Sequence, residues 1–189
     1  MNQEILKEVF VDHIRDLFDA EKQLVKALPK LAKAADSEEL ANALRTHLEE
    51  TQNHVTRLEG VFKAVGAPAK GKSCKGMQGL IEEGNEAVQE KEEGPIRDLA
   101  IIAGGQKVEH YEMSAYGTAR TLAEQLGLTE AVELLQQTED EEENADATLT
   151  EVATSIYDSA DEEGEEKSAT MGASGTGAST KRTTRKTAR

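Results

Sequence analysis

Apolar residues recur at intervals of three and four along most of the first 157 positions, which is the spacing of one face of an α-helix. Runs of β-branched residues are short and proline is rare, as expected for packed helices. The sequence therefore predicts an all-α fold. Four apolar stripes predict four long helices, over residues 2–35, 37–66, 95–126 and 129–157.

The connections between the stripes predict the topology. Asp36 and Glu39 resemble a capping box at the start of the second helix. Each pair of helices is joined by only a few residues, so its members should be antiparallel neighbours. The connection over residues 66–95 is long enough to cross the bundle and contains a predicted short helix at 77–89. Two antiparallel hairpins joined by a long crossover form a ferritin-like four-helix bundle, which we expect over residues 1–157.

Ionisable residues interrupt the apolar stripes. Glu21, Glu109 and Glu142 each occupy an apolar phase on a different helix, and His54 does so on the remaining one, with Glu50 beside it. Burying a lone carboxylate is costly, and converging carboxylates repel one another unless a cation lies between them. Oxygen ligands and imidazole suit iron and manganese. Including residues three or four positions away, the pattern predicts a dinuclear iron or manganese site whose ligands are Glu21, Glu50, His54, Glu109, Glu112, Glu142 and Asp146.

Several of these residues have simpler interpretations. Any single glutamate can be a solvated surface charge, since the chain has 37 acidic residues. His47 is also in register on the second stripe, where it either hydrogen-bonds to Glu50 or packs at a helix interface without binding metal. Tyr111 and Tyr116 are expected to be packing residues. Cys74, in a loop rich in lysine and glycine, is expected to be a free thiol.

The charge is unevenly distributed. The formal net charge is -15, from 37 acidic and 22 basic residues. Residues 158–189 are low in complexity, first acidic and then basic, and we expect them to be disordered. Their charges cancel, so the body carries the net charge and should repel nucleic acid and anionic membranes. The basic end from Lys181 to Arg189 offers at most weak contact with nucleic acid. Within the acidic run 139–143, only Glu142 is phased inward.

Nothing in the sequence resembles a membrane or export signal. No apolar run approaches the ~18 residues of a membrane span. The N-terminus has neither the basic nor the apolar region of a signal peptide. The single cysteine, Cys74, excludes an internal disulfide framework. A cytoplasmic location is the expectation.

Seven short motifs occur in a defined order, and together they resemble those of the YciE/YciF-type ferritin-like stress proteins. The resemblance covers about residues 4–157. It implies a ferritin-like bundle that is usually dimeric, a role in the bacterial stress response and a metal site, but no established reaction. The motifs are AEKQL from Ala20, HLEET from His47, GLIEEGNE from Gly79, QKVEHYE from Gln106, YGT from Tyr116, AEQLG from Ala123 and EE-x-x-x-D from Glu141.

The chain also resembles the wider group of di-iron carboxylate proteins such as rubrerythrins. Their pattern has a Glu and a Glu-x-x-His on each half of the bundle. Here Asn53 and Ala145 stand where that pattern has histidine, and His54 and Asp146 follow one residue later. Glu112 resembles the second Glu of a rubrerythrin Glu-x-x-Glu. The smaller number of imidazoles favours manganese or weak binding, and ferroxidase or peroxidase chemistry does not carry over.

The expected function is that of a stress-response protein whose dinuclear site handles oxygen or peroxide. The alternative is a non-enzymatic, dimeric structural or interaction protein, in which the carboxylates bond to tyrosines and histidines and no metal is held. We expect a homodimer in either case, because the helix faces carrying Leu6, Val25 and Phe62 are apolar outside the main stripes.

Overall fold

The computed structural model describes the backbone of residues 2–173 and the side chains of residues 2–160. Within the described residues the chain is helical, without strands, which confirms the all-α prediction. No described helix is both long and apolar enough to cross a membrane. The five helices are α1 (Gln3–Ala34), α2 (Glu38–Val65), α3 (Lys75–Glu90), α4 (Pro95–Gln125) and α5 (Thr129–Ala173).

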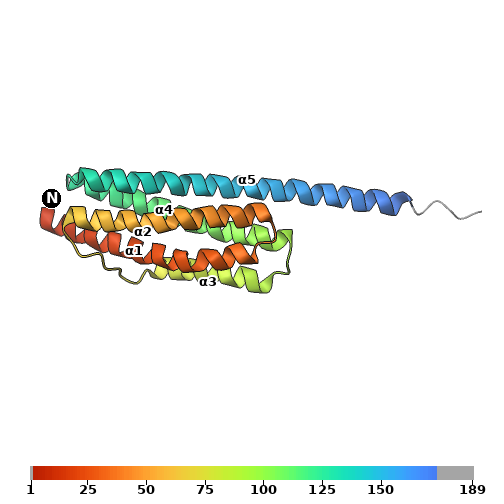
Figure 1. Ribbon diagram of the computed structural model, residues 1–189, viewed down its shortest axis with the longest axis horizontal. Helices are drawn as coiled ribbons and strands as arrows, with labels where there is room; N and C mark the ends of the chain where they lie inside the picture. The colour runs from red at the N-terminus through yellow and green to blue at the C-terminus, as the bar shows by residue number, and fades with distance from the viewer. Residues whose placement is uncertain (1, 174–189) are drawn as a thin grey trace, which may run out of the picture.

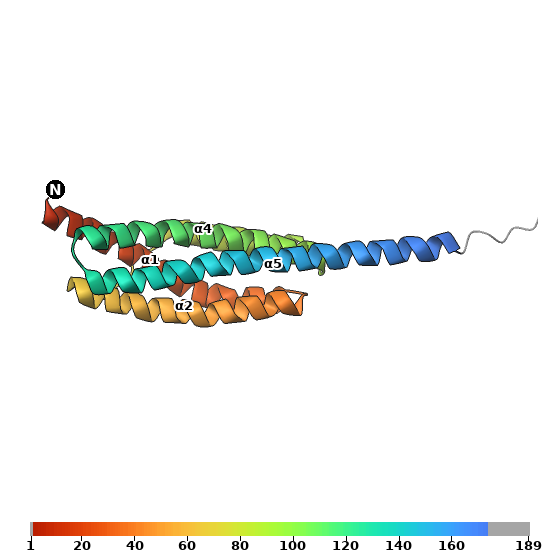
Figure 2. The same cartoon turned by 90° about the horizontal axis from the view of Figure 1, so that it is seen from above.

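Four of the helices form the predicted bundle. The α1–α2 and α4–α5 pairs are the two hairpins, and α2 packs against α5 while α1 packs against α4 (Figures 1 and 2). The short helix α3 lies in the crossover and packs on α1 and α4. The ferritin-like four-helix bundle with a long crossover is therefore confirmed.

The last helix is longer than the sequence analysis predicts. It continues past Tyr157 to Ala173 and projects beyond the other helices (Figure 1). The apolar stripe ends at Ile156, but the next residues are rich in alanine and glutamate and contain no proline, so the helix can continue through local backbone bonds. The prediction that the last helix ends near Tyr157 is therefore wrong. Residues 174–189, which include the basic end from Lys181 to Arg189, lie outside the described residues.

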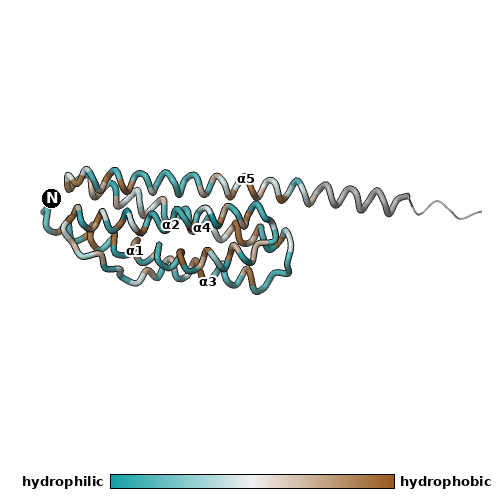
Figure 3. The backbone as a smooth tube through the Cα atoms, in the orientation of Figure 1, coloured by the Kyte–Doolittle hydropathy of each residue, from teal (hydrophilic) through white to brown (hydrophobic). Residues whose placement is uncertain are grey.

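The core has two apolar clusters, and every bundle helix contributes to both. Hydrophobic and hydrophilic residues alternate along each helix (Figure 3). The first cluster includes Phe10, Leu58 and Leu135, and the second includes Leu24 and Leu149. Between the positions that feed the two clusters, each helix buries ionisable side chains. The bundle thus encloses a polar layer between two apolar layers.

The start of α2 is capped differently from the prediction. Ser37, not Asp36, is the N-cap residue, and its hydroxyl accepts a hydrogen bond from the Leu40 amide. The buried carboxylate of Asp98, in the first turn of α4, accepts the backbone N–H groups of Asp36 at 2.9 Å and Ser37 at 2.7 Å. The predicted capping box of Asp36 and Glu39 is therefore absent from the start of α2. The Ser37 hydroxyl caps the helix, and Asp98 of the other hairpin accepts the two amides that precede it.

The crossover is tied to the bundle at Cys74. Its backbone N–H donates to Asp19 on α1 at 2.9 Å, and its thiol caps α3 by accepting the Met77 amide. The Tyr111 hydroxyl lies 3.0 Å from the sulfur and donates to Asp16 at 2.8 Å. Cys74 is a free thiol, as predicted, but it is buried rather than placed in an open loop.

The faces expected to support a dimer are largely covered within one chain. Leu6 and Phe62 are buried, and Val25 is half-buried. The exposed large apolar side chains among the described residues are instead Ile5, Val9, Ile96 and Tyr157.

Candidate metal centre

Six ionisable side chains form the polar layer, and all are buried. Glu21, His54, Glu112 and Glu142 have no exposed surface, and Glu109 and His47 are 3% and 6% exposed. Each of the four bundle helices supplies at least one of them. We refer to these six residues as the polar layer: Glu21 on α1, His47 and His54 on α2, Glu109 and Glu112 on α4, and Glu142 on α5.

Helical periodicity decides which residues of α2 enter the layer. His47, Thr51 and His54 follow steps of four and three, so they lie on one buried face that Leu58 continues. Glu50 falls one position before Thr51 and is therefore turned toward the edge, where its side chain is 30% exposed. The Thr51 hydroxyl donates to the His47 carbonyl oxygen at 2.7 Å and takes no further partner in the layer.

One half of the layer surrounds His54. Its Nδ1 lies 3.1 Å from Glu142 Oε1 and 3.4 Å from Glu21 Oε1. The Tyr116 hydroxyl donates a short hydrogen bond to the same oxygen of Glu21. Ligand atoms of Glu21, His54 and Glu142 all lie within 4.8 Å of one another. This half therefore joins α1, α2 and α5 through three potential metal ligands.

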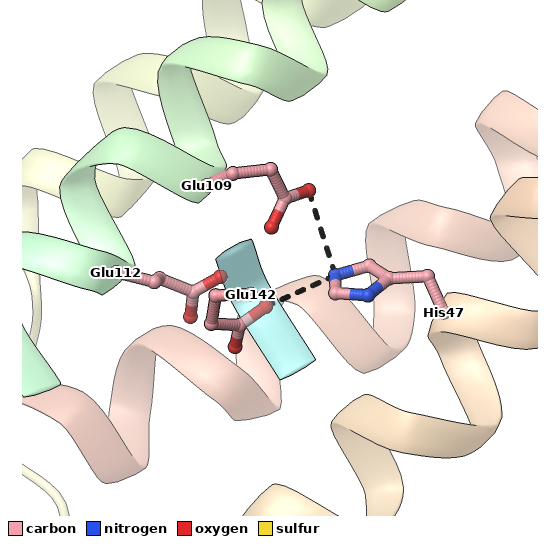
Figure 4. A group of neighbouring side chains, drawn as sticks. All are labelled: His47, Glu109, Glu112 and Glu142. Atoms are coloured by element: carbon pink, nitrogen blue, oxygen red, sulfur yellow. Dashed lines mark ion pairs between the residues drawn. The ribbon is translucent and has the colours of Figure 1, made fainter. Parts of the chain in front are cut away.

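The other half surrounds His47. Its Nε2 lies 3.6 Å from Glu109 Oε1 and 3.8 Å from Glu142 Oε2. Figure 4 shows the carboxylates of Glu109, Glu112 and Glu142 turned toward one another and toward this imidazole. Ligand atoms of these four residues also lie within 4.8 Å of one another. Glu142 belongs to both halves, so the two groups share one carboxylate, as bridging in a dinuclear site requires.

A half-buried ion pair fixes the orientation of His54 from outside the layer. Glu141 Oε2 lies 2.8 Å from His54 Nε2, and both Glu141 oxygens accept from the Arg57 guanidinium, at 2.6 and 2.7 Å. With Nε2 engaged in this way, Nδ1 faces Glu21 and Glu142. Such outer partners hold the tautomer and ring orientation of metal-binding histidines.

The charges of the layer are strongly perturbed. Burial, reinforced by neighbouring carboxylates, raises the pKa of Glu109 and of Glu112 well above the usual value. Burial lowers the pKa of His54, but the hydrogen-bonding carboxylates of Glu142 and Glu21 outweigh it and raise the pKa to about 11. Burial opposes protonation of His47 too, yet Glu109 and Glu50 raise its pKa to about 9. The metal-free layer therefore retains protons at neutral pH.

The layer lacks enough internal partners for its polar atoms. Eleven buried side-chain nitrogen and oxygen atoms of the described residues have no hydrogen-bond partner. All of them belong to the polar layer except the Nε atoms of Arg15 and Arg97. Unsatisfied buried groups are costly and rare, and a bound ion is one of the few arrangements that satisfies several at once. The donors are carboxylate oxygens and imidazole nitrogens, so the residues present fit a divalent metal.

The structure brings five of the seven sequence-predicted ligands together: Glu21, His54, Glu109, Glu112 and Glu142. Two predicted ligands lie outside this group. Glu50 lies at the edge, 3.5 Å from His47 Nδ1. Asp146 is partly exposed and accepts from Gln106 at 3.2 Å, because Ala145 and Leu149 continue the inward face after Glu142.

Three further residues matter more than their sequence positions suggest. His47 lies inside the layer rather than behind Glu50. Tyr116 orients Glu21 in addition to packing in the apolar core. Glu141, expected to be solvated, is paired with Arg57 and His54. For His47 the signal was present in the stripe, whereas the partner of Glu141 lies 84 positions away and has no local signal.

The fold and this layer define a ferritin-like bundle with a carboxylate- and histidine-rich interior. The chain belongs to the YciE/YciF family, described as "Domain of unknown function (DUF892)", whose family profile matches residues 5–161. Protein YciF of Escherichia coli (strain K12) is 45% identical over 154 residues, covering 81% of this chain and 93% of that protein.

Solved structures agree with this assignment. The crystal structure of the E. coli stress protein YciF superposes with a TM-score of 0.79 at 44% identity, covering 81% of this chain and 97% of that one. YcfI of Rhodopseudomonas palustris gives a TM-score of 0.75 at 39% identity, covering 77% and 92%. A Xanthomonas campestris protein, 16% identical, shares the fold, with a TM-score of 0.67 and coverage of 85% and 99%.

Proposed function

We propose that this chain is a stress-response protein that holds two iron or manganese ions in its polar layer and uses them to handle oxygen or peroxide. The observation that carries this proposal is the convergence of four carboxylates and two imidazoles whose buried atoms lack other partners. The description of E. coli YciF, at 44% identity, as a stress protein supports the biological role.

The two groups that share Glu142 assign ligands to each ion. One ion would be held by Glu21, His54 and Glu142, and the other by His47, Glu109, Glu112 and Glu142. Ligands at ~2.0–2.2 Å from an ion lie at most about 4.4 Å apart across it. The present limit of 4.8 Å within each group means that only a small contraction is needed on binding.

The chain's own residues prepare the layer for this chemistry. When bound, a pair of iron or manganese ions supplies electrons to a small oxidant. The apolar clusters on both sides exclude bulk water. Tyr116 donates to Glu21 and so fixes one carboxylate, while Glu141 and Arg57 fix His54. Binding metal must displace the protons held by Glu109, Glu112 and the histidines, so affinity should rise with pH.

Metal analysis and a melting series with Glu142→Leu test the proposal. Wild type purified without chelator should contain iron or manganese. Adding Mn(II) or Fe(II) should raise its melting temperature. At a metal concentration one hundred times Kd, binding stabilises the folded state by about 2.7 kcal/mol. Glu142→Leu should lose the response, because both groups lose their shared ligand. Its metal-free form should be less stable than wild type, since the protonated His54 and His47 lose a carboxylate that pairs with them.

The control for this series is Glu143→Leu, a substitution one position along α5 at an exposed residue. It should keep the full response to metal. A wild type that contains no metal and whose melting temperature does not change with Mn(II) or Fe(II) would defeat the proposal. So would equal shifts in wild type and Glu142→Leu.

A second function is favoured by the pairing inside the layer. His54 lies close to Glu142 and Glu21, and Tyr116 donates to Glu21, so protonated histidines can neutralise much of the buried charge without metal. In that case the chain is a non-enzymatic structural or interaction protein of the stress response. Absence of metal from native protein, together with unchanged melting on metal addition, would support this alternative.

A further inference from the structure

A cavity of about 130 Å³ lies between α2 and α5 and reaches the polar layer. His47 and Glu109 form its inner end. Glu50 and the exposed Asn144 lie toward solvent, and the half-buried Ala145 lies on the α5 side. The space therefore connects the surface of the bundle with two of the proposed metal ligands.

The exposure of the layer points to the same place. His47 and Glu109 are the members with measurable exposure, whereas Glu21, His54, Glu112 and Glu142 have none. Both ring nitrogens of His47 are buried and lack a hydrogen-bond partner. An unpartnered imidazole thus lies at the inner end of a cavity whose outer end carries the polar side chains of Glu50 and Asn144.

A second cavity also touches His47 and Glu109 but differs in character. It measures about 30 Å³ and is bounded mainly by leucine, isoleucine, alanine and glycine residues of α1, α3 and α4. That volume holds about one water molecule. Apart from Asn85, His47 and Glu109 its lining is apolar, so it offers few groups to replace the hydration shell of a cation and is poorly suited to ion transfer.

Glu50 occupies the position expected of a first acceptor for a cation. Its carboxylate is partly exposed, and its Oε2 lies 3.5 Å from His47 Nδ1. The inner end of the cavity, at His47 and Glu109, is buried, so a hydrated divalent ion cannot reach it with its full shell of water. An ion that enters must therefore lose water, and a carboxylate at the outer end can replace it.

We propose that the cavity between α2 and α5 is the uptake route for divalent cations, and that Glu50 is a transient ligand that passes the ion to His47 and Glu109. This inference rests on the proposed function, because it requires a metal-binding layer. It also gives Glu50, which the sequence pattern predicts as a permanent ligand, a different role that matches its place at the edge.

Filling the cavity tests the route. Ala145→Leu places a larger apolar side chain on the cavity wall, and Ala147→Leu makes the same change at an exposed position two residues later on α5. Uptake of Co(II) by chelator-treated full-length protein is followed by its absorption in a stopped-flow instrument, and release by transfer to EDTA. Ala145→Leu should slow uptake and release by the same factor and leave Kd and stoichiometry unchanged, because one path serves both directions. Ala147→Leu should match wild type.

Removing the charge of Glu50 tests its role independently. Glu50→Gln should slow Co(II) uptake about tenfold, since steering of an ion by a carboxylate is lost, without raising the release rate or lowering stoichiometry. Glu49→Gln, at the neighbouring exposed residue of α2, should have little effect. A permanent ligand would behave differently, because its loss would accelerate release and lower the amount of Co(II) bound.

The outcomes separate the two proposals. If wild type binds no Co(II), Mn(II) or Fe(II), the proposed function fails and the uptake route fails with it. If wild type binds Co(II) but Ala145→Leu and Glu50→Gln load at the wild-type rate, the route is overturned while the metal centre stands. If Ala145→Leu does not fold, the release rate and stoichiometry of Glu50→Gln decide the question.

Discussion

In the metal-free protein, four residues of the polar layer (His47, His54, Glu109 and Glu112) have raised pKa values, so they hold protons at a pH at which the same side chains in water would lose them. Burial lowers the pKa values of His47 and His54, but the carboxylates that face them outweigh burial and raise these values to about 9 and about 11. Glu109 and Glu112 have raised pKa values because they are buried beside other carboxylates. Glu142 differs: burial favours its neutral form, but His54 and His47 outweigh this and lower its pKa.

These shifts predict how stability depends on pH without metal. A histidine whose pKa is raised on folding stabilises the fold fully below its unfolded value of 6.5, and this stability is lost as the pH rises through about 9 and about 11. The raised pKa values of Glu109 and Glu112 also make the fold less stable as the pH rises above 4.5. The lowered pKa of Glu142 contributes stability that is already complete above pH 4.5. Between pH 6.5 and 9, the EDTA-treated protein should lose about 3 kcal/mol of stability for each of the two histidines, and its melting temperature should fall accordingly.

The measurement is a series of melting curves in EDTA and in Mn(II). Metal competes with the protons, so Mn(II) should oppose the fall and raise the melting temperature most at the higher pH. His54→Gln should flatten the metal-free curve. His110→Gln is the control, because that imidazole is 68% exposed. A metal-free stability that rises between pH 6.5 and 9 would contradict the protonation assigned to the layer.

At the scale of helices, Asp98 links the two hairpins. It lies in the first turn of α4 but accepts two backbone N–H groups at the start of α2. The first amides of a helix have no partner within the helix, so an acceptor brought from another element satisfies them and fixes the relative position of both. The end of the bundle beside the α1–α2 turn is held by this contact.

Replacing Asp98 by alanine should therefore destabilise the protein by about 2 kcal/mol, since two backbone amides at the start of α2 lose their acceptor. Asp98→Asn, which retains one oxygen acceptor, should cost less. Asp36→Ala is the control: its side chain does not cap α2, although the sequence pattern suggested that it does. Urea unfolding of the three variants measures the difference. A larger loss of stability from Asp36→Ala than from Asp98→Ala would contradict this prediction and support a capping box at Asp36.

At the scale of the whole molecule, the core ends before the chain does. Ile156 is the last buried residue among the described side chains, and the remainder of α5 projects past the bundle (Figure 2). Residues 1–157 should therefore fold alone, with a melting temperature close to that of the full chain, although circular dichroism should show less helix. Loss of cooperative unfolding on truncation would show that the end of α5 contributes to the core.

Assembly is a second property of the whole molecule. We expect a homodimer, on a basis that differs from the sequence prediction because Leu6 and Phe62 are already buried. Ile5 and Val9, 58% and 51% exposed, lie four residues apart on α1 and form an apolar stripe that a second copy can cover. Light scattering should report a dimer independent of reducing agent, and Ile5→Glu with Val9→Glu should shift it to monomer, whereas Ile96→Glu should not. A monomer at high micromolar concentration would refute this expectation.

The sequence by itself determined the helices, their hairpin topology and the inward phase of Glu21, Glu109 and Glu142. Periodicity and turn residues are local, so they can be read without knowing any neighbour. The same periodicity also marked His47 and His54. Periodicity alone does not decide which of two adjacent residues on a helix faces the bundle interior.

The tertiary structure decided which of two adjacent residues faces the polar layer. Packing of α2 against α5 turned Thr51 rather than Glu50 inward, and the face of α5 placed Ala145 rather than Asp146 beside the layer. It also paired Arg57 with Glu141, residues 84 positions apart. Local sequence cannot specify such contacts, because the free energy that selects them comes from side chains on other helices.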